Sequence, residues 1–84
     1  MEEIKGKVKK FILDEFLPGE SPEALNDETP LITGGVLDSI GTLKLVSFLE
    51  ETFNIQIKAH EADFSNLNTI SDIAGLVHTK LEAG

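Results

Sequence analysis

The chain has 84 residues, which suits one small domain and leaves little room for a second. Fifteen acidic residues against seven basic ones give a net charge of −8, a field that disfavours nucleic acid and anionic membrane surfaces as partners. The chain contains no cysteine, which excludes disulfides, thiolate metal sites and a cysteine nucleophile.

The first predicted helix covers residues 2–17, and Pro18-Gly19 ends it. Its apolar side chains recur at helical spacing and share one face: Ile4, Val8, Phe11 and Ile12. Residues 18–37 contain several proline and glycine residues and no sustained period, so we predict a long loop there. Four apolar side chains are available to hold this loop against the core: Leu25, Leu31, Val36 and Leu37.

A second helix is predicted from Asp38 to Asn54. On a helical wheel, one face is assigned to the core: Thr42, Leu45, Val46, Leu49 and Phe53. The opposite face is predicted to point to solvent: Ile40, Lys44, Ser47 and Glu51. Leu43 and Phe48 lie at the flanks between these two faces.

The C-terminal third predicts a short turn of helix from Ala59 to Phe64 and a last helix that starts at Thr69. Residues 69–72 fit a capping box, with Asp72 in place of the preferred glutamate. The apolar face of the last helix contains five residues: Ile70, Ile73, Ala74, Val77 and Leu81.

Together these elements predict an all-α fold, a small four-helix bundle of three main helices and one short helix with a long first loop. We expect a single domain over residues 1–84 that is stable as a monomer, because each helix buries four or five aliphatic groups. Residues 1–5 lack an apolar signal core and no apolar run reaches membrane-spanning length. We therefore expect a cytoplasmic protein without a membrane partner.

The segment Gly34-Gly35-Val36-Leu37-Asp38-Ser39-Ile40 combines a sharp turn, two apolar anchors and the start of a helix. The simplest interpretation is an N-cap, in which Asp38 and Ser39 satisfy free backbone N–H groups. A capping segment can also be a modification site, because the helix N-terminus would stabilise a phosphodiester on Ser39. We expect the Ser39 hydroxyl to be exposed, with Ile40 beside it as a partner contact.

Asp38-Ser39-Ile40, preceded by Gly35-Val36-Leu37, resembles the Asp-Ser-Leu attachment motif of acyl and peptidyl carrier proteins. The resemblance covers nearly the whole chain and agrees with its length and acidity. Further stretches share the register of the family: Pro30-Leu31, Leu45-Val46, Leu49-Glu50-Glu51, Phe53, Ile57 and Asn66-Leu67-Asn68-Thr69-Ile70.

The resemblance implies a carrier role. A phosphopantetheinyl transferase would take 4'-phosphopantetheine from coenzyme A and join it to Ser39, with Asp38 as the neighbouring motif residue. The terminal thiol would hold acyl or aminoacyl cargo as a thioester, and loading ligases or synthases would supply the catalysis. The chain itself is therefore predicted to be no enzyme and to have no catalytic residues. His60 and His78 are interpreted as surface residues without a carboxylate at local spacing.

The resemblance also implies a partner-binding face of seven residues: Ile40, Gly41, Leu43, Lys44, Ser47, Glu50 and Glu51. In carriers of fatty-acid synthases, the positions that match Gly41 and Lys44 are usually acidic. The reversed charge at Lys44 favours a dedicated or secondary-metabolism pathway served by adenylating ligases. Alternatively, Lys44 only forms a solvated pair with a neighbouring acid.

Two other interpretations are open. An acidic helical interaction module without a cofactor would share the fold and use Asp38 and Ser39 only as a cap. A calcium-binding protein is disfavoured, because Asn26-Asp27-Glu28 lacks the required ligand spacing, and we predict no metal site. Leu43 and Phe48 could line a shelter for cargo, or could instead pack against the short third helix or the long loop.

Overall fold

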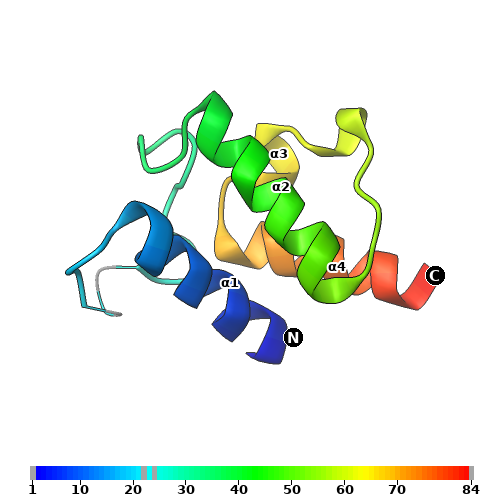
Figure 1. Ribbon diagram of the computed structural model, residues 1–84, viewed down its shortest axis with the longest axis horizontal. Coiled ribbons are helices and arrows are strands. Elements are labelled where there is room, and N and C mark those ends of the chain that lie inside the picture. Colours follow the sequence, from blue (N-terminus) through cyan, green and yellow to red (C-terminus); the bar gives the residue numbers. More distant parts are fainter. Residues whose placement is uncertain (1, 22, 24, 84) are drawn as a thin grey trace.

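The computed structural model describes residues 2–21, 23 and 25–83, and over these ranges the chain forms helices and no strand. There are three long helices: α1 (Glu2–Phe16), α2 (Ser39–Phe53) and α4 (Ile70–Ala83). Two short elements separate α2 from α4: the 3₁₀ helix η2 (Ala59–Glu61) and the single-turn helix α3 (Phe64–Leu67). The prediction of a small all-α bundle with a long first loop is confirmed (Figure 1).

Helix α4 lies at the centre of the packing, since it contacts α1, α2 and α3, and α1 also contacts α2. The long loop between α1 and α2 closes one end of the bundle (Figure 1). Within the part of the chain that is described, every helix falls short of the length and apolar character needed to cross a membrane.

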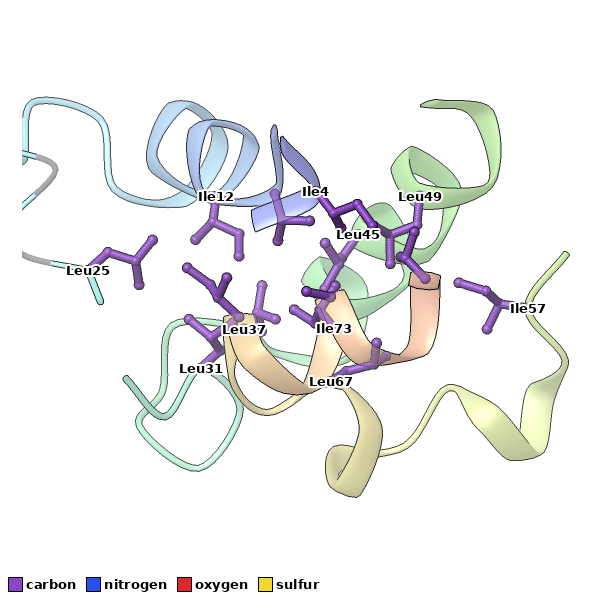
Figure 2. Packing of buried hydrophobic residues seen from close by; sticks show 14 residues of the cluster. Ile4, Ile12, Leu25, Leu31, Leu37, Leu45, Leu49, Ile57, Leu67 and Ile73 are labelled. Carbon is purple, nitrogen blue, oxygen red and sulfur yellow. The ribbon is translucent and has the colours of Figure 1, made fainter. Parts of the chain in front are cut away.

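The core is built from aliphatic side chains of all these elements (Figure 2): Ile4, Val8, Ile12, Leu25, Leu31, Leu37, Leu45, Leu49, Ile57, Leu67, Ile70, Ile73, Ala74 and Val77. Figure 2 shows Leu31 and Leu37 of the long loop pointing into the same cluster as Ile12 and Ile73. The predicted apolar anchors of the loop are confirmed, because Leu25, Leu31 and Leu37 are buried and Val36 packs against the cluster.

The predicted core faces of the helices are confirmed with two exceptions. Leu81 is 46% exposed, because the last turn of α4 projects beyond the other helices (Figure 1). Thr42 is only partly buried, and its hydroxyl donates a hydrogen bond to the backbone oxygen of Asp38 at 2.8 Å. A threonine in the first turn of a helix therefore serves the start of α2 rather than the core.

The short turn of helix predicted over residues 59–64 is confirmed in part, because a 3₁₀ helix covers the first half of this range and the α-helical turn lies after it. The structure forms η2 at Ala59–Glu61, where the Glu61 carboxylate accepts the Lys58 N–H at 3.0 Å, and then a separate α3. Burial of Leu67 draws α3 toward the core, which explains why the α-helical turn lies later in the chain. The predicted cap of the last helix is confirmed in part, because Thr69 Oγ1 accepts the Asp72 N–H at 3.0 Å and α4 begins at Ile70.

Candidate functional site

Residues 30–38, named the Ser39 loop from here on, lead directly into α2. Gly34 lies so close to the Pro30 backbone that a Cβ atom there would be 2.2 Å from the Pro30 carbonyl oxygen. Gly35 has a φ of +85°, a conformation that side chains other than glycine rarely adopt. The Leu37 N–H then donates to the Leu31 oxygen at 2.8 Å and closes the loop. Both glycines of the sequence motif are thus needed for the turn before Ser39.

Asn68, between α3 and α4, holds the base of the Ser39 loop. Its side-chain oxygen accepts the N–H groups of Ile32 and Thr33 at 3.0 and 3.1 Å, and its backbone oxygen accepts the Leu31 N–H at 2.6 Å. Asn68 belongs to the stretch that resembles other carriers before the last helix, but no role at the site was predicted for it. Because these partners are 35 and 36 residues away in the chain, no local pattern could have indicated the contacts.

Asp38 caps the start of α2, as predicted. It is extended, with φ −99° and ψ −170°, and its Oδ1 accepts the Gly41 N–H at 2.6 Å. Its backbone oxygen accepts the Thr42 N–H at 2.8 Å, which begins the hydrogen bonding of the helix. The cap satisfies a backbone donor that would otherwise have no partner inside the helix.

Ser39 is the first residue of α2 and is exposed. The N–H groups of Ser39 and Ile40 have no acceptor among the described residues, so they add to the positive end of the helix dipole. An exposed hydroxyl at a helix start, beside free N–H donors, is compatible with a covalently linked phosphodiester, because these donors would stabilise its negative charge.

Two hollows flank the outward face of α2 and meet at Leu43, which is 66% exposed. The first, of about 590 Å³, lies beside the Ser39 hydroxyl and has these lining residues: Ile32, Leu37, Asp38, Ser39, Thr42, Leu43 and Ala62. The second, of about 470 Å³, runs between α1 and α2: Phe11, Glu15, Ile40, Leu43, Lys44, Ser47, Phe48 and Glu51. An arm on Ser39 therefore has apolar surface on either side of Leu43.

Phe48 packs against α1, a contact that was not among the alternatives predicted for it. Its ring stacks on Phe11 of α1 with centroids 4.1 Å apart and an interplanar angle of 15°. The rings of Phe11 and Phe16 also contact each other edge to face, with centroids 5.9 Å apart. Phe11 and Phe48 both line the hollow between α1 and α2.

Five of the seven residues predicted for partner binding lie exposed on α2: Ile40, Leu43, Lys44, Ser47 and Glu51. Ile40 is 67% exposed, as expected for an apolar residue on the outward face. Among the described residues, no carboxylate lies within 4.0 Å of the Lys44 amine, although Glu15 and Glu51 line the same hollow. The interpretation of Lys44 as half of a surface ion pair is therefore not supported by the geometry.

Gly41 and Glu50, the other two residues predicted for partner binding, are buried and partly buried, respectively. Gly41 is buried, and a Cβ atom there would lie 3.0 Å from the Phe16 ring and 3.1 Å from Asp38 Oδ1. Its expected place on the surface was wrong, because a glycine here makes room for the ring of Phe16. Glu50 is partly buried, and its Oε2 accepts the Ile57 N–H at 2.9 Å. Its carboxylate holds the segment after α2 and does not form an outward pair with Glu51.

The segment after α2 contains the group with the clearest electrostatic perturbation. Lys80 of α4 donates to Glu61 Oε1 at 2.5 Å, and this hydrogen bond, with a second from the Lys58 backbone, lowers the pKa of Glu61. At the other end of the bundle, Lys5 donates to Asp27 at 3.0 Å, and this hydrogen bond raises the pKa of Lys5. The side chains of these two pairs are not among the residues that line the two hollows.

The two histidines are exposed and line neither hollow. His78 contacts the Glu82 carboxylate one helical turn later, so the expectation that neither histidine has a carboxylate at local spacing was wrong. The pair lies in the last turns of α4, at the end of the molecule away from the start of α2 (Figure 1). Over the described ranges, no three histidine or carboxylate groups come together in a way that could hold a metal ion.

The profile of a protein family described as "Phosphopantetheine attachment site" matches residues 17–77. Curated relatives include the D-alanyl carrier proteins of Streptococcus pyogenes serotype M5 (strain Manfredo), serotype M49 (strain NZ131) and serotype M1. Each is 34% identical over 62 residues, which cover 74% of this chain and 76% of the relative. The matched range includes the Ser39 loop, α2 and the segment before α4.

Proposed function

The chain belongs to the phosphopantetheine-binding carrier protein family, and from this premise we propose that Ser39 is the residue to which 4'-phosphopantetheine is attached. One observation supports this assignment above the others: the Ser39 hydroxyl is exposed at the first position of α2, directly after the Asp38 cap. The attachment needs a hydroxyl that a transferase can reach, and the Ser39 loop holds this one at the surface.

In the proposed attachment, the Ser39 hydroxyl gives its proton to a base of the transferase. Its oxygen forms the new bond to phosphorus while the nucleotide part of coenzyme A leaves. When bound, the group supplies a terminal thiol that holds an acyl or aminoacyl cargo as a thioester. Asp38 keeps the first turn of α2 formed, and the free N–H groups of Ser39 and Ile40 stabilise the negative phosphodiester.

The assignment is tested by incubating the chain with coenzyme A and a broad-specificity phosphopantetheinyl transferase and measuring the intact mass. We expect a rise by one arm for the wild-type chain and for Thr52→Ala, which removes another exposed hydroxyl of α2 outside the proposed partner surface. Ser39→Ala should show no rise. Modification of Ser39→Ala would refute the assignment. An unmodified wild-type chain, beside a control carrier that is modified, would instead support an acidic helical interaction module.

For the partner surface, we propose the exposed residues of α2, without the buried Gly41 and the occupied Glu50: Ile40, Leu43, Lys44, Ser47 and Glu51. Ile40 and Leu43 offer apolar contact area at the centre of this surface. Lys44 gives it a positive charge that has no carboxylate partner among the described residues. A partner with a carboxylate opposite Lys44 would be favoured over one that presents only basic residues.

We further propose an aminoacyl cargo, loaded by an adenylating ligase in a dedicated pathway. The support is the similarity to D-alanyl carrier proteins, together with the positive charge of Lys44. The holo chain would be incubated with ATP, amino acids and the ligase encoded beside its gene, and the mass of the loaded chain measured. Loading of an amino acid supports the proposal, whereas a ketosynthase beside the gene and acceptance of malonyl groups alone would contradict it.

A further inference from the structure

Asn68 supplies hydrogen-bond acceptors to three consecutive residues of the Ser39 loop. Its side-chain oxygen accepts the N–H groups of Ile32 and Thr33 at 3.0 and 3.1 Å and also contacts the Thr33 hydroxyl at 3.4 Å. Its backbone oxygen accepts the Leu31 N–H at 2.6 Å. Asn68 is the polar contact of this loop with the segment between α3 and α4, beside the packing of its apolar side chains on the core and the Asp38 cap of α2.

The hydrogen bonds of Asn68 are connected to the start of α2 by one further hydrogen bond. Leu31, which Asn68 binds, accepts the Leu37 N–H at 2.8 Å, and Leu37 directly precedes the Asp38-Ser39 pair. The side chains of Leu31 and Leu37 are both buried and belong to the same core cluster. Ile32, whose N–H is also bound by Asn68, lines the hollow beside the Ser39 hydroxyl.

Asn66, two residues before Asn68, forms a hydrogen bond with a different segment. The Asn66 side-chain nitrogen donates to the Glu61 backbone oxygen at 2.9 Å, so Asn66 holds the segment after α2 and not the Ser39 loop. Asn66 acts as a donor and Asn68 as an acceptor, although both lie beside the buried Leu67. The chain therefore contains its own matched comparison for a role of Asn68.

We propose that Asn68 is a positioning residue for the Ser39 hydroxyl and sets the rate at which the arm is attached. The inference rests on the proposed function of Ser39. Without the Asn68 oxygen, two backbone N–H groups lose their acceptor and the loop can adopt other positions on the core. Group transfer to a hydroxyl requires a defined position of the attacking oxygen, so a loosened loop slows the transfer.

The chemistry of the contact predicts which substitutions are tolerated. The hydrogen bonds of the Asn68 side chain with the described residues all use its oxygen, so Asn68→Asp keeps the acceptor in nearly the same shape. Asn68→Ala removes the acceptor, and Asn66→Ala removes a side chain of equal size from the neighbouring contact. An effect of the acceptor itself therefore appears in Asn68→Ala and is absent in the other two variants.

The first measurement is the rate of arm attachment by one transferase, followed by intact mass at several concentrations of the apo chain. Asn68→Ala should lower kcat/KM by roughly ten- to a hundred-fold, the order of effect expected for a misplacement near 1 Å. Asn68→Asp and Asn66→Ala should stay close to the wild-type rate. Attachment to Asn68→Ala at the wild-type rate would overturn the proposal, as would an equal loss in Asn66→Ala.

The second measurement, amide hydrogen exchange on the unmodified chain, separates this inference from the proposed function. In Asn68→Ala the amides of Ile32, Thr33 and Leu37 should exchange faster, while that of Val77 in α4 should keep its protection. Unchanged protection of Ile32 and Thr33 would overturn the positioning role even if Ser39 is modified. If the wild-type chain is never modified, the function of Ser39 fails, and exchange at Ile32, Thr33 and Leu37 alone decides whether Asn68 holds the loop.

Discussion

Two irregular segments follow the first two long helices, and different kinds of hydrogen bond hold them. The base of the Ser39 loop is bound through neutral groups: backbone amides donate to the Asn68 oxygens and to the Leu31 carbonyl. Residues 54–63, named the second connection from here on, are bound through carboxylates. Glu50 accepts the Ile57 N–H, and Glu61 accepts the Lys58 N–H and the Lys80 amine.

The two segments beside the candidate site are therefore held by groups of different chemistry. The amide and carbonyl groups that hold the base of the Ser39 loop do not titrate in the physiological range, so these contacts do not depend on pH. The ion pair of Glu61 with Lys80 requires a charged carboxylate and is lost on protonation. Ala62, next to Glu61, and Ile32 of the Ser39 loop both line the hollow beside Ser39, so this hollow lies between the two kinds of contact.

The largest expected effect tests whether buried leucines anchor the Ser39 loop. Leu31 is fully buried, and Leu31→Ala should lower the free energy of unfolding by about 2–5 kcal/mol. That is a large share of the stability of a small domain, which is roughly 0.05–0.15 kcal/mol per residue. The control Leu81→Ala removes the same atoms at a site that is 46% exposed and should cost much less. Equal losses in urea unfolding would show that the loop is not anchored by burial.

A smaller loss of stability is expected for a substitution in the tight turn of the Ser39 loop. Gly34→Ala places a Cβ atom 2.2 Å from the Pro30 oxygen, so the backbone must shift, and we expect a loss of about 1–3 kcal/mol. Gly6→Ala is the control, because no atom lies within 4 Å of its added Cβ and alanine favours the helix by about 1 kcal/mol. Thermal unfolding should move in opposite directions for the two variants. A neutral or stabilised Gly34→Ala would contradict the close approach.

The smallest expected effect concerns how the stability contributed by the Glu61–Lys80 pair changes with pH. The pKa of Glu61 lies below its ordinary value of 4.5 because Lys80 and the Lys58 N–H bind the carboxylate. A carboxyl group with a lowered pKa in the folded state stabilises the fold above its unfolded pKa, and this contribution is lost as the pH falls through the folded value. Lys80→Met should therefore lower Tm at pH 7, and the difference from wild type should shrink below about pH 4.5.

Lys44→Met provides the control for the pH series, since the Lys44 amine has no carboxylate within 4.0 Å among the described residues. Its difference from wild type should stay nearly constant over the same range. A difference for Lys80→Met that grows on acidification would reverse the sign expected for a lowered glutamate pKa. It would show that the second connection is not held by the Glu61 carboxylate.

Much of the fold follows from periodicity in the sequence. The apolar stripes of the three long helices lie in the core because regular spacing alone places them on one face. Helical periodicity also indicates a buried position for Gly41, since Gly41, Leu45 and Leu49 follow one another at intervals of four residues and all are buried. The predicted surface position came from the resemblance to other carriers, whose side chains at this position differ from glycine.

The polar contacts of the site were less accessible to prediction. The Glu50 carboxylate turns back because α2 ends at Asn54, whose φ of 54° reverses the chain and brings Ile57 within reach. No repeating pattern encodes such a reversal. The hold of Asn68 on the Ser39 loop likewise depends on how α3 and α4 pack, which is known only once the whole core is assembled.

The separation of 35 and 36 residues between Asn68 and its partners has a consequence for engineered chimaeras. The outward face of α2 can be transplanted from another carrier without disturbing these contacts, because its exposed residues make none of them. Because the donors are backbone N–H groups, a crossover that exchanges residues 30–38 alone keeps them unless it places proline at position 32 or 33, whereas loss of Asn68 removes the acceptor. Recombination of this protein therefore keeps these contacts when the asparagine is retained and the incoming loop follows the same path.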